Sequence, residues 1–171
     1  SSLIALASCV GPSAPPPPAP SLPPIPVPAP PPLSADWRDW PVTPGDWSYR
    51  KSTDGSTSSF GMPGSAPLLS LRCEPAKRQI VISRVVDLPA AQSAGQMTLR
   101  TSFAAVQWPV AITPAGSATT AYVNATRAAN DAALDQMAFS RGRFAIEFPG
   151  SAPLVVPNWA EVARIIEDCR S

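Results

Sequence analysis

Residues 143–148 read Arg143-Phe144-Ala145-Ile146-Glu147-Phe148, and their large apolar side chains occupy every second position. Successive side chains of a β-strand point to opposite faces, so the two phenylalanines and the isoleucine would share one face and the two charged residues the other. This alternation is typical of an antiparallel strand with one face on a core and the other in water. The stretch predicts a β-rich fold with its apolar face buried.

Similar short runs recur along the chain between turn-forming residues. We expect further strands at residues 46–51, 56–61, 68–74, 79–85, 96–103, 119–123 and 154–156. Two helical patterns interrupt these runs. The sequence therefore predicts an α+β, β-rich domain, built as an antiparallel sheet or a small sandwich or barrel, with two short helices of which the second is C-terminal.

Each helical pattern has a residue that suits its start. We expect Asn130 to cap a helix over residues 131–140, with Gly142 in the left-handed conformation after its end. We expect Asn158, which follows Pro157, to cap the second helix. The side chains expected to face inward are Leu134, Met137 and Ala138 in the first helix, and Trp159, Val162, Ala163, Ile166 and Cys169 in the second.

The hexapeptide Pro-Gly-Ser-Ala-Pro-Leu occurs twice, at residues 63–68 and 149–154. Each copy lies between two strand patterns, and its proline and glycine favour a hairpin turn. Two explanations of the repeat stay open, namely duplication of a sheet unit and convergence on a favourable turn.

The N-terminal residues carry a different kind of signal. Leu6-Ala7-Ser8-Cys9 resembles the cleavage motif of a bacterial lipoprotein signal peptide, with residues 1–8 as a truncated signal. The resemblance implies that Cys9 is lipidated and anchors the chain to a membrane, with the folded domain in the periplasm of the cell envelope. In that family an aspartate directly after the cysteine is typical of inner-membrane lipoproteins. This sequence has Val10 there, so the resemblance implies the outer membrane rather than the inner. The alternative is a stray apolar tail.

Residues 11–33 contain 13 prolines and no charged residue. So many prolines remove backbone donors and fix φ, so residues 9–33 are expected to form a lipidated cysteine followed by a disordered, extended polyproline spacer. At about 3.1 Å per residue its reach is on the order of 70 Å. A PxxP ligand for a recognition module is the alternative. Residues 34–171 are then expected to form one β-rich domain.

Cys73 and Cys169 remain as an even pair once Cys9 carries lipid. An oxidising periplasm would favour a disulfide between them, which would fasten the last helix to the strand that contains Cys73. Two free buried thiols and a redox pair are the alternatives, although no CxxC spacing supports redox chemistry.

The composition limits the chemistry of the domain. Its formal net charge is +1, so no nucleic-acid partner is expected. The chain has no histidine, which excludes Ser-His-Asp and Cys-His nucleophiles and histidine-ligated metals. The aspartates lack calcium-loop spacing. We therefore expect no catalytic residue, metal or cofactor, although a serine–lysine pair with Lys51 or Lys77 stays open.

Two groups of residues are candidates for ligand binding. Arg141 and Arg143 flank a helix end and could hold a carboxylate or phosphate, or they could face solvent and favour the helix C-terminus. Trp37 and Trp40 could stack on sugars, or they could fasten the N-terminal part of the domain to its core.

The domain resembles a group of uncharacterised alphaproteobacterial envelope proteins through Gly45-Asp46-Trp47-Ser48-Tyr49, Cys73, residues 138–144 and residues 165–170. It has a more distant likeness to the invasion-associated locus B family, through the Gly-Asp-Trp opening, although that family has more cysteines. Neither resemblance implies an activity. The resulting hypothesis is a non-enzymatic envelope lipoprotein that binds another envelope protein or peptidoglycan, and the alternative is a glycan-binding or glycan-processing periplasmic protein.

Overall fold

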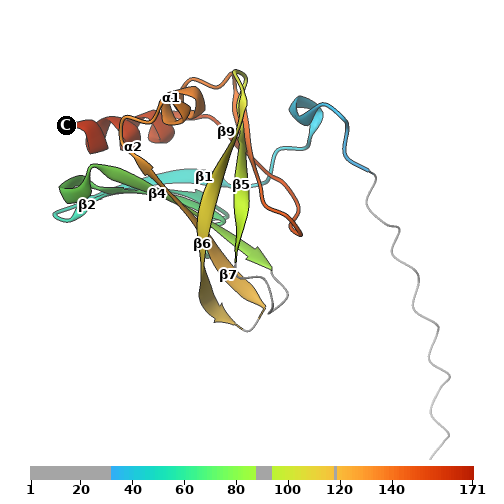
Figure 1. Ribbon diagram of the computed structural model, residues 1–171, viewed down its shortest axis with the longest axis horizontal. Helices are drawn as coiled ribbons and strands as arrows, with labels where there is room; N and C mark the ends of the chain where they lie inside the picture. The colour runs from blue at the N-terminus through green and yellow to red at the C-terminus, as the bar shows by residue number, and fades with distance from the viewer. Residues whose placement is uncertain (1–31, 88–93, 118) are drawn as a thin grey trace, which may run out of the picture. The chain divides into compact units, whose positions relative to one another are not determined.

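The computed structural model describes residues 32–87, 94–117 and 119–171 (Figure 1). Leu33–Ser171 form one compact unit. The predictions for the signal peptide, the lipidated Cys9 and nearly all of the polyproline spacer lie outside the described residues.

The described strands form a single antiparallel sheet that curls into a half-barrel (Figure 1). From one edge to the other, the strands are β1 (Asp46–Ser52), β2 (Gly55–Gly61), β3 (Leu69–Glu74), β4 (Gln79–Asp87), β7 (Thr120–Ala128), β6 (Ala105–Ser117), β5 (Ala94–Arg100), β8 (Arg143–Glu147) and β9 (Leu154–Pro157). The β-rich fold with its second helix at the C-terminus is thus confirmed.

The order of the strands combines a meander with a Greek key. Strands β1 to β4 pair in sequence, whereas β7 rather than β5 lies beside β4. Strands β5, β6 and β7 pair in sequence and so complete a Greek-key arrangement with β4. Strands β8 and β9 then extend the sheet beyond β5.

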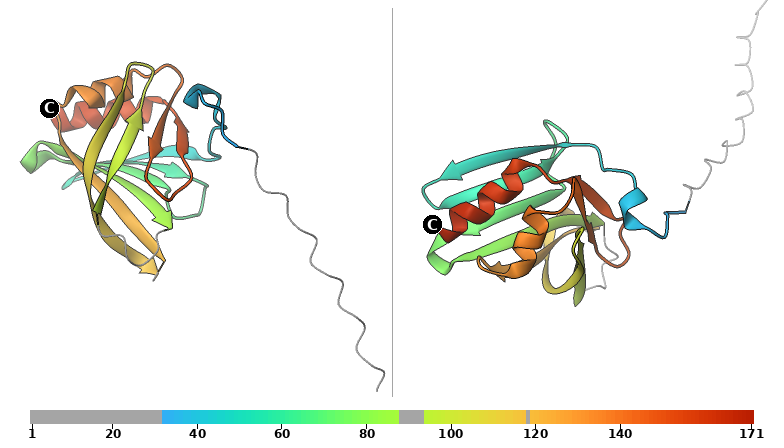
Figure 2. Two further views of the ribbon diagram at one scale, coloured as in Figure 1. Left: turned by 45° about the vertical axis from the view of Figure 1, so that its right-hand side comes forward. Right: turned by 90° about the horizontal axis from the view of Figure 1, so that it is seen from above.

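Two α-helices cover the concave face of the curled sheet, α1 (Ala132–Ala138) and α2 (Ala160–Arg170). Figure 2 shows α2 lying over the strands β1 to β4. Helix α2 contacts each of these strands, and it also contacts α1. Two single-turn 3₁₀ helices, η1 (Trp37–Asp39) and η2 (Pro75–Lys77), lie before β1 and between β3 and β4.

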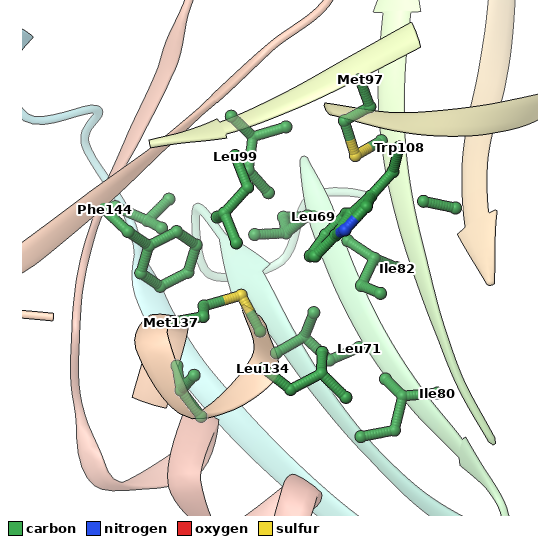
Figure 3. Packing of buried hydrophobic residues seen from close by; sticks show 14 of the residues in the cluster. Leu69, Leu71, Ile80, Ile82, Met97, Leu99, Trp108, Leu134, Met137 and Phe144 are labelled. Atoms are coloured by element: carbon green, nitrogen blue, oxygen red, sulfur yellow. The ribbon is translucent and has the colours of Figure 1, made fainter. Parts of the chain in front are cut away.

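The main core lies between the concave face of the sheet and the helices. Leu134 and Met137 of α1 point toward the leucines, isoleucines and Trp108 that the sheet turns inward (Figure 3). Burial alternates along β3 and β4 as the pleat requires. As expected, Phe144, Ile146 and Phe148 are buried.

One long strand was not predicted. Strand β6 contains Pro109 and Pro114, and proline within a run argues against a central strand because it donates no ladder hydrogen bond. The structure accommodates Pro114 beside an irregularity in the β6–β7 register. Trp108 of this strand is only 1 % exposed. Strand β7 also continues to Ala128, beyond the predicted end, and β5 stops at Arg100, before its predicted end.

Both helix caps were predicted wrongly by one residue. Asp131, not Asn130, caps α1, because its carboxylate accepts a hydrogen bond from the backbone N–H of Ala133 (2.8 Å). Trp159, not Asn158, is the N-cap of α2. Asn158 instead donates to the backbone carbonyls of Ala138 (2.7 Å) and Ser140 (2.8 Å), so it ties α2 to the end of α1.

The inward stripe of α2 also differs from the prediction. Trp159 is 46 % exposed, because it precedes the helix, and Ala163 is only half-buried. Ile165, which was not assigned to the stripe, is fully buried beside Val162, Ile166 and Cys169.

The two copies of the hexapeptide form equivalent turns, which confirms the predicted hairpins. One joins β2 to β3 and the other joins β8 to β9. In both, the serine N–H donates to the carbonyl three residues earlier, from Ser65 to Met62 and from Ser151 to Phe148, at 3.1 Å. Gly64 and Gly150 have φ of 78° and 83°. Proline followed by a left-handed glycine is the signature of a type II turn, in which glycine supplies the positive φ of the third residue and proline suits the second.

Candidate functional site

Cys73 of β3 and Cys169 of α2 form a disulfide, as predicted, with a Cα–Cα distance of 5.4 Å. Each cysteine is 2 % exposed. The bond joins the C-terminal end of the last helix to the sheet. Arg170, the next residue, adds hydrogen bonds to the carbonyl of Ala129 and the carboxylate of Asp135, so the helix end is fixed from two sides.

Trp37 and Trp40 are buried on the outer face of β8 and β9. They are 8 % and 9 % exposed and form a second small core with Ala145 and Val155. The Trp40 indole N–H donates to the carbonyl of Ser34 (2.7 Å). These contacts support the alternative in which the two tryptophans fasten the N-terminal part of the domain to its core.

The same N-terminal segment pairs with the free edge of β9. The backbone N–H of Thr43 donates to the carbonyl of Val155 (2.8 Å), and the Val155 N–H donates to the Thr43 hydroxyl (3.2 Å). Trp47 then enters the main core, where its indole N–H donates to the carbonyl of Pro157 (2.8 Å). The segment therefore covers an edge that would otherwise present unpaired backbone groups.

A pocket of about 280 Å³ lies beside these tryptophans and is lined by Trp37, Arg38, Ser102, Arg141 and Arg143. It unites three of the four predicted ligand-binding residues. The fourth, Trp40, does not line the pocket, although its carbonyl accepts a hydrogen bond from the Arg143 guanidinium (3.1 Å). Sequence reasoning missed Arg38 and Ser102, since Ser102 reaches the pocket only through long-range pairing of its turn.

The hydroxyl groups of two serines hold the wall of this pocket, and one of these serines is buried. Ser140 is 3 % exposed; its hydroxyl donates to the carbonyl of Arg143 (2.6 Å) and accepts from the backbone N–H of Ser102 (3.0 Å). The Ser102 hydroxyl in turn accepts from the backbone N–H of Arg141 (3.0 Å). The turn between β5 and β6 is thereby locked to the connection between α1 and β8.

The pocket carries more positive than negative charge. Arg38 lies over the Trp37 ring and forms an exposed ion pair with Asp36 (3.3 Å). The backbone N–H of Arg38, which donates to Asp36, lowers the pKa of that carboxyl below its usual value. Among the described residues, no carboxylate forms an ion pair with Arg141 or Arg143. Guanidinium groups of this kind bind carboxylates and phosphates through paired hydrogen bonds.

The residues that could support catalysis are placed differently. Lys51 lies opposite Ser56 across β1 and β2, but its side chain is 70 % exposed and its ammonium lies 4.0 Å from the Asp168 carboxylate. Burial acts to raise the pKa of Asp168, but a hydrogen bond from Tyr49 and the nearby Lys51 and Arg164 charges lower it overall. A lysine that serves as a base must be desolvated, so this cluster does not meet the requirement for a serine–lysine nucleophile.

Within residues 32–87, 94–117 and 119–171, no group of three or more histidine, cysteine, aspartate or glutamate side chains is arranged to hold a metal ion. No helix in this part of the chain is long and apolar enough to cross a membrane.

A larger hollow of about 710 Å³ lies along the edge formed by β1, β2 and the first hexapeptide turn. Its lining includes the polar Ser48, Arg50, Thr57 and Ser59. None of the four residues predicted to bind a ligand lines it. We therefore place the candidate site at the smaller pocket lined by Trp37, Arg38, Ser102, Arg141 and Arg143, which is called the arginine pocket below.

The curled antiparallel sheet, its concave-face helices and the arginine pocket define a β-rich half-barrel with a cationic surface site. Comparison with known protein families, with curated protein sequences and with solved structures found no match.

Proposed function

We propose that this chain is a non-enzymatic binding module of the bacterial cell envelope, anchored by acyl chains on Cys9 and extended from the membrane by its polyproline spacer. In this proposal the domain works in the periplasm, and its arginine pocket takes a carboxylate or phosphate of another envelope component. The tether part rests on the Leu6-Ala7-Ser8-Cys9 motif and the proline-rich composition.

The pocket itself carries the binding part of the proposal. Arg141 lines it and is exposed, and no carboxylate of the described residues forms an ion pair with it. The hydrogen bonds of Ser102 and Ser140 fix the backbone on either side. A rigid backbone that presents an unpaired guanidinium suits recognition of an anion, because little conformational freedom is lost on binding.

A pulldown from crosslinked envelopes tests this function. We expect the wild-type protein to enrich an anionic envelope component, the Arg141→Glu variant to lose it, and the matched Arg50→Glu variant to retain it. Arg50 is an exposed arginine on β1, in another part of the fold, so its replacement makes the same charge change. Enrichment of nothing under several crosslinking conditions, or equal loss in both variants, would count against the proposal.

The glycan alternative depends on the flat faces of Trp37 and Trp40, which burial leaves largely covered. We expect Trp40→Ala to lower the free energy of unfolding by about 3 kcal/mol, because a large buried side chain is lost. Urea denaturation measures this cost, with the half-exposed Trp159→Ala as a control that changes stability by less than about 1 kcal/mol. Unchanged stability together with lost peptidoglycan co-sedimentation would instead support glycan binding.

A further inference from the structure

Three exposed aromatic side chains gather at one end of the domain, beside the arginine pocket. Phe103, Phe139 and Trp159 are 59 %, 68 % and 46 % exposed. They belong to three different connections: β5 to β6, α1 to β8, and β9 to α2. Together with Arg141, these residues are called the aromatic end below.

Hydrogen bonds show that these three connections lie side by side. Ser102 and Ser140, the neighbours of Phe103 and Phe139, are bonded through the Ser102 N–H and the Ser140 hydroxyl. Asn158, the neighbour of Trp159, donates to the Ser140 carbonyl. In Figure 1 the turn between β5 and β6 and the connection from α1 to β8 meet at the top of the domain.

The only charged side chain within these three connections is positive. Residues 101–104, 139–142 and 158–159 contain Arg141 and no acidic residue. The adjoining pocket adds Arg143 and the Asp36-paired Arg38. Single exposed apolar residues are ordinary on protein surfaces, but a grouped set beside basic side chains marks a binding surface.

We propose that the aromatic end docks on an anionic lipid bilayer, with a lipid phosphate in the arginine pocket and the aromatic side chains in the bilayer interface. This inference rests on the proposed function and names the class of its anionic ligand. A small soluble anion would need only the arginines and would leave the exposed aromatic side chains without a role. Aromatic rings beside basic side chains suit the boundary between headgroups and acyl chains.

The spread of the aromatic side chains over several connections favours lipid over a protein partner. They stand on three separate connections and are between 46 % and 68 % exposed. Lipids rearrange around exposed side chains wherever they stand, whereas a protein partner must match the position of each of them.

Vesicle flotation of the full chain tests the inference, with Cys9→Ser so that no acyl chain contributes. We expect the protein to float with vesicles of equal parts phosphatidylglycerol and phosphatidylcholine, and not with phosphatidylcholine alone. Phe139→Ser and Arg141→Glu should each weaken flotation about tenfold, through lost apolar burial and lost attraction to the anionic surface. The matched controls Tyr122→Ser and Arg50→Glu, at exposed positions on β7 and β1, should bind like wild type.

Trp159 also reports insertion directly. The other tryptophans, Trp37, Trp40, Trp47 and Trp108, are at most 9 % exposed. Brominated acyl chains quench only indoles that reach them, so we expect quenching of the Cys9→Ser protein and its loss in a further Trp159→Phe variant that still floats.

The outcomes separate this inference from the proposed function. No flotation with anionic vesicles, or equal weakening by the control substitutions, overturns lipid docking. If envelope pulldown still depends on Arg141 while vesicles are not bound, the binding function stands and the ligand is a protein or another anionic component. If neither vesicles nor an envelope component is bound, both proposals fail.

Discussion

Arg84 shows how a single residue can join distant parts of a curled sheet. It occupies an inward position of β4, at 5 % exposure, and its guanidinium donates to the carbonyls of Ile146 (2.7 Å) and Ala152. Burial lowers its pKa to about 10, and the charge of Glu147 offsets part of this effect. The alternation of β4 places residue 84 on the same face as Ile80 and Ile82, so the sequence pattern contained this signal.

We expect Arg84→Ala to destabilise the domain by about 2 to 4 kcal/mol, because two carbonyls lose their donors and a cavity opens in the core. Arg84→Met should cost less, since it fills more of the space and removes the burial cost of the charge. Urea denaturation of the oxidised protein measures both. A smaller loss for alanine than for methionine would contradict this assignment of the two hydrogen bonds.

Glu74 links stability to acid pH. Hydrogen bonds from Gln79 (2.6 Å) and Lys77 (3.0 Å), with a further contribution from Arg72, lower its pKa from 4.5 to about 2. A carboxyl whose pKa is lower in the folded state stabilises the fold above pH 4.5 and loses this contribution as the pH falls toward 2.

The Glu74→Gln variant should therefore be less stable than wild type near neutral pH, by no more than about 1 kcal/mol because Lys77 and Arg72 are exposed. The difference should shrink as the pH falls from about 5 to about 2. Denaturation midpoints across this range measure it, with the exposed Glu167→Gln as the comparison. A difference that does not change with pH would indicate that the hydrogen-bond geometry, and not the charge, stabilises this turn.

At the scale of elements, alternation and turn residues predicted most of the sheet, whereas prolines concealed β6. Val106, Trp108, Val110 and Ile112 do alternate along β6, but Pro109 and Pro114 interrupt the run and argue against a strand. Tertiary pairing with β5 and β7 outweighs this local cost. The cap of α1 was displaced by one residue because asparagine and aspartate are both good caps, and the sequence alone does not say which side chain turns back to the helix. At α2 the Asn158 side chain is used by the carbonyls of Ala138 and Ser140, and Trp159 takes the cap position without a side-chain hydrogen bond.

The candidate site could be predicted only in part. Arg141 and Arg143 stand close together in the sequence, and their pattern at the end of a helix was recognisable. Their meeting with Trp37, Arg38 and Ser102 depends on packing between parts of the chain that are far apart in sequence. The burial of Trp37 and Trp40 depends in the same way on the small side chain of Ala145 in β8 and on Val155 in β9.

The disulfide should control the stability of α2 on the sheet. It joins residues separated by 96 positions, and on the chain-entropy model a loop of this length contributes up to about 4 to 5 kcal/mol. We expect the Cys73→Ala/Cys169→Ala double variant to unfold at a lower urea concentration and to exchange the amide hydrogens of α2 faster. Unchanged exchange in α2 would show that Arg170 and the apolar stripe hold the helix without the bond.

At the scale of the whole molecule, the two sides of the half-barrel sheet are held by different means. The N-terminal segment pairs with β9 through Thr43, while the disulfide and the apolar face of α2 hold the strands on the β1 side. Both devices use residues near the beginning or the end of the domain. The sheet is therefore stabilised by the parts of the chain that lead into and out of it, which leaves the connections at the aromatic end free to carry a binding surface.

The proposed acyl anchor on Cys9 predicts the mass of the mature protein. If Cys9 is lipidated and becomes the first residue, the protein purified from its own membranes without reductant should begin at Cys9 and be heavier than that polypeptide by acyl groups. The Cys73–Cys169 bond should make it lighter by two hydrogen atoms. Cys9→Ser should abolish the acyl mass and release the protein from the membrane fraction, since two or more acyl chains are needed for stable anchoring and a single chain binds only marginally. Intact mass spectrometry of both proteins measures these changes. An unlipidated chain that still sediments with membranes would contradict the acyl anchor and leave the aromatic end as the part of the chain to test for membrane attachment.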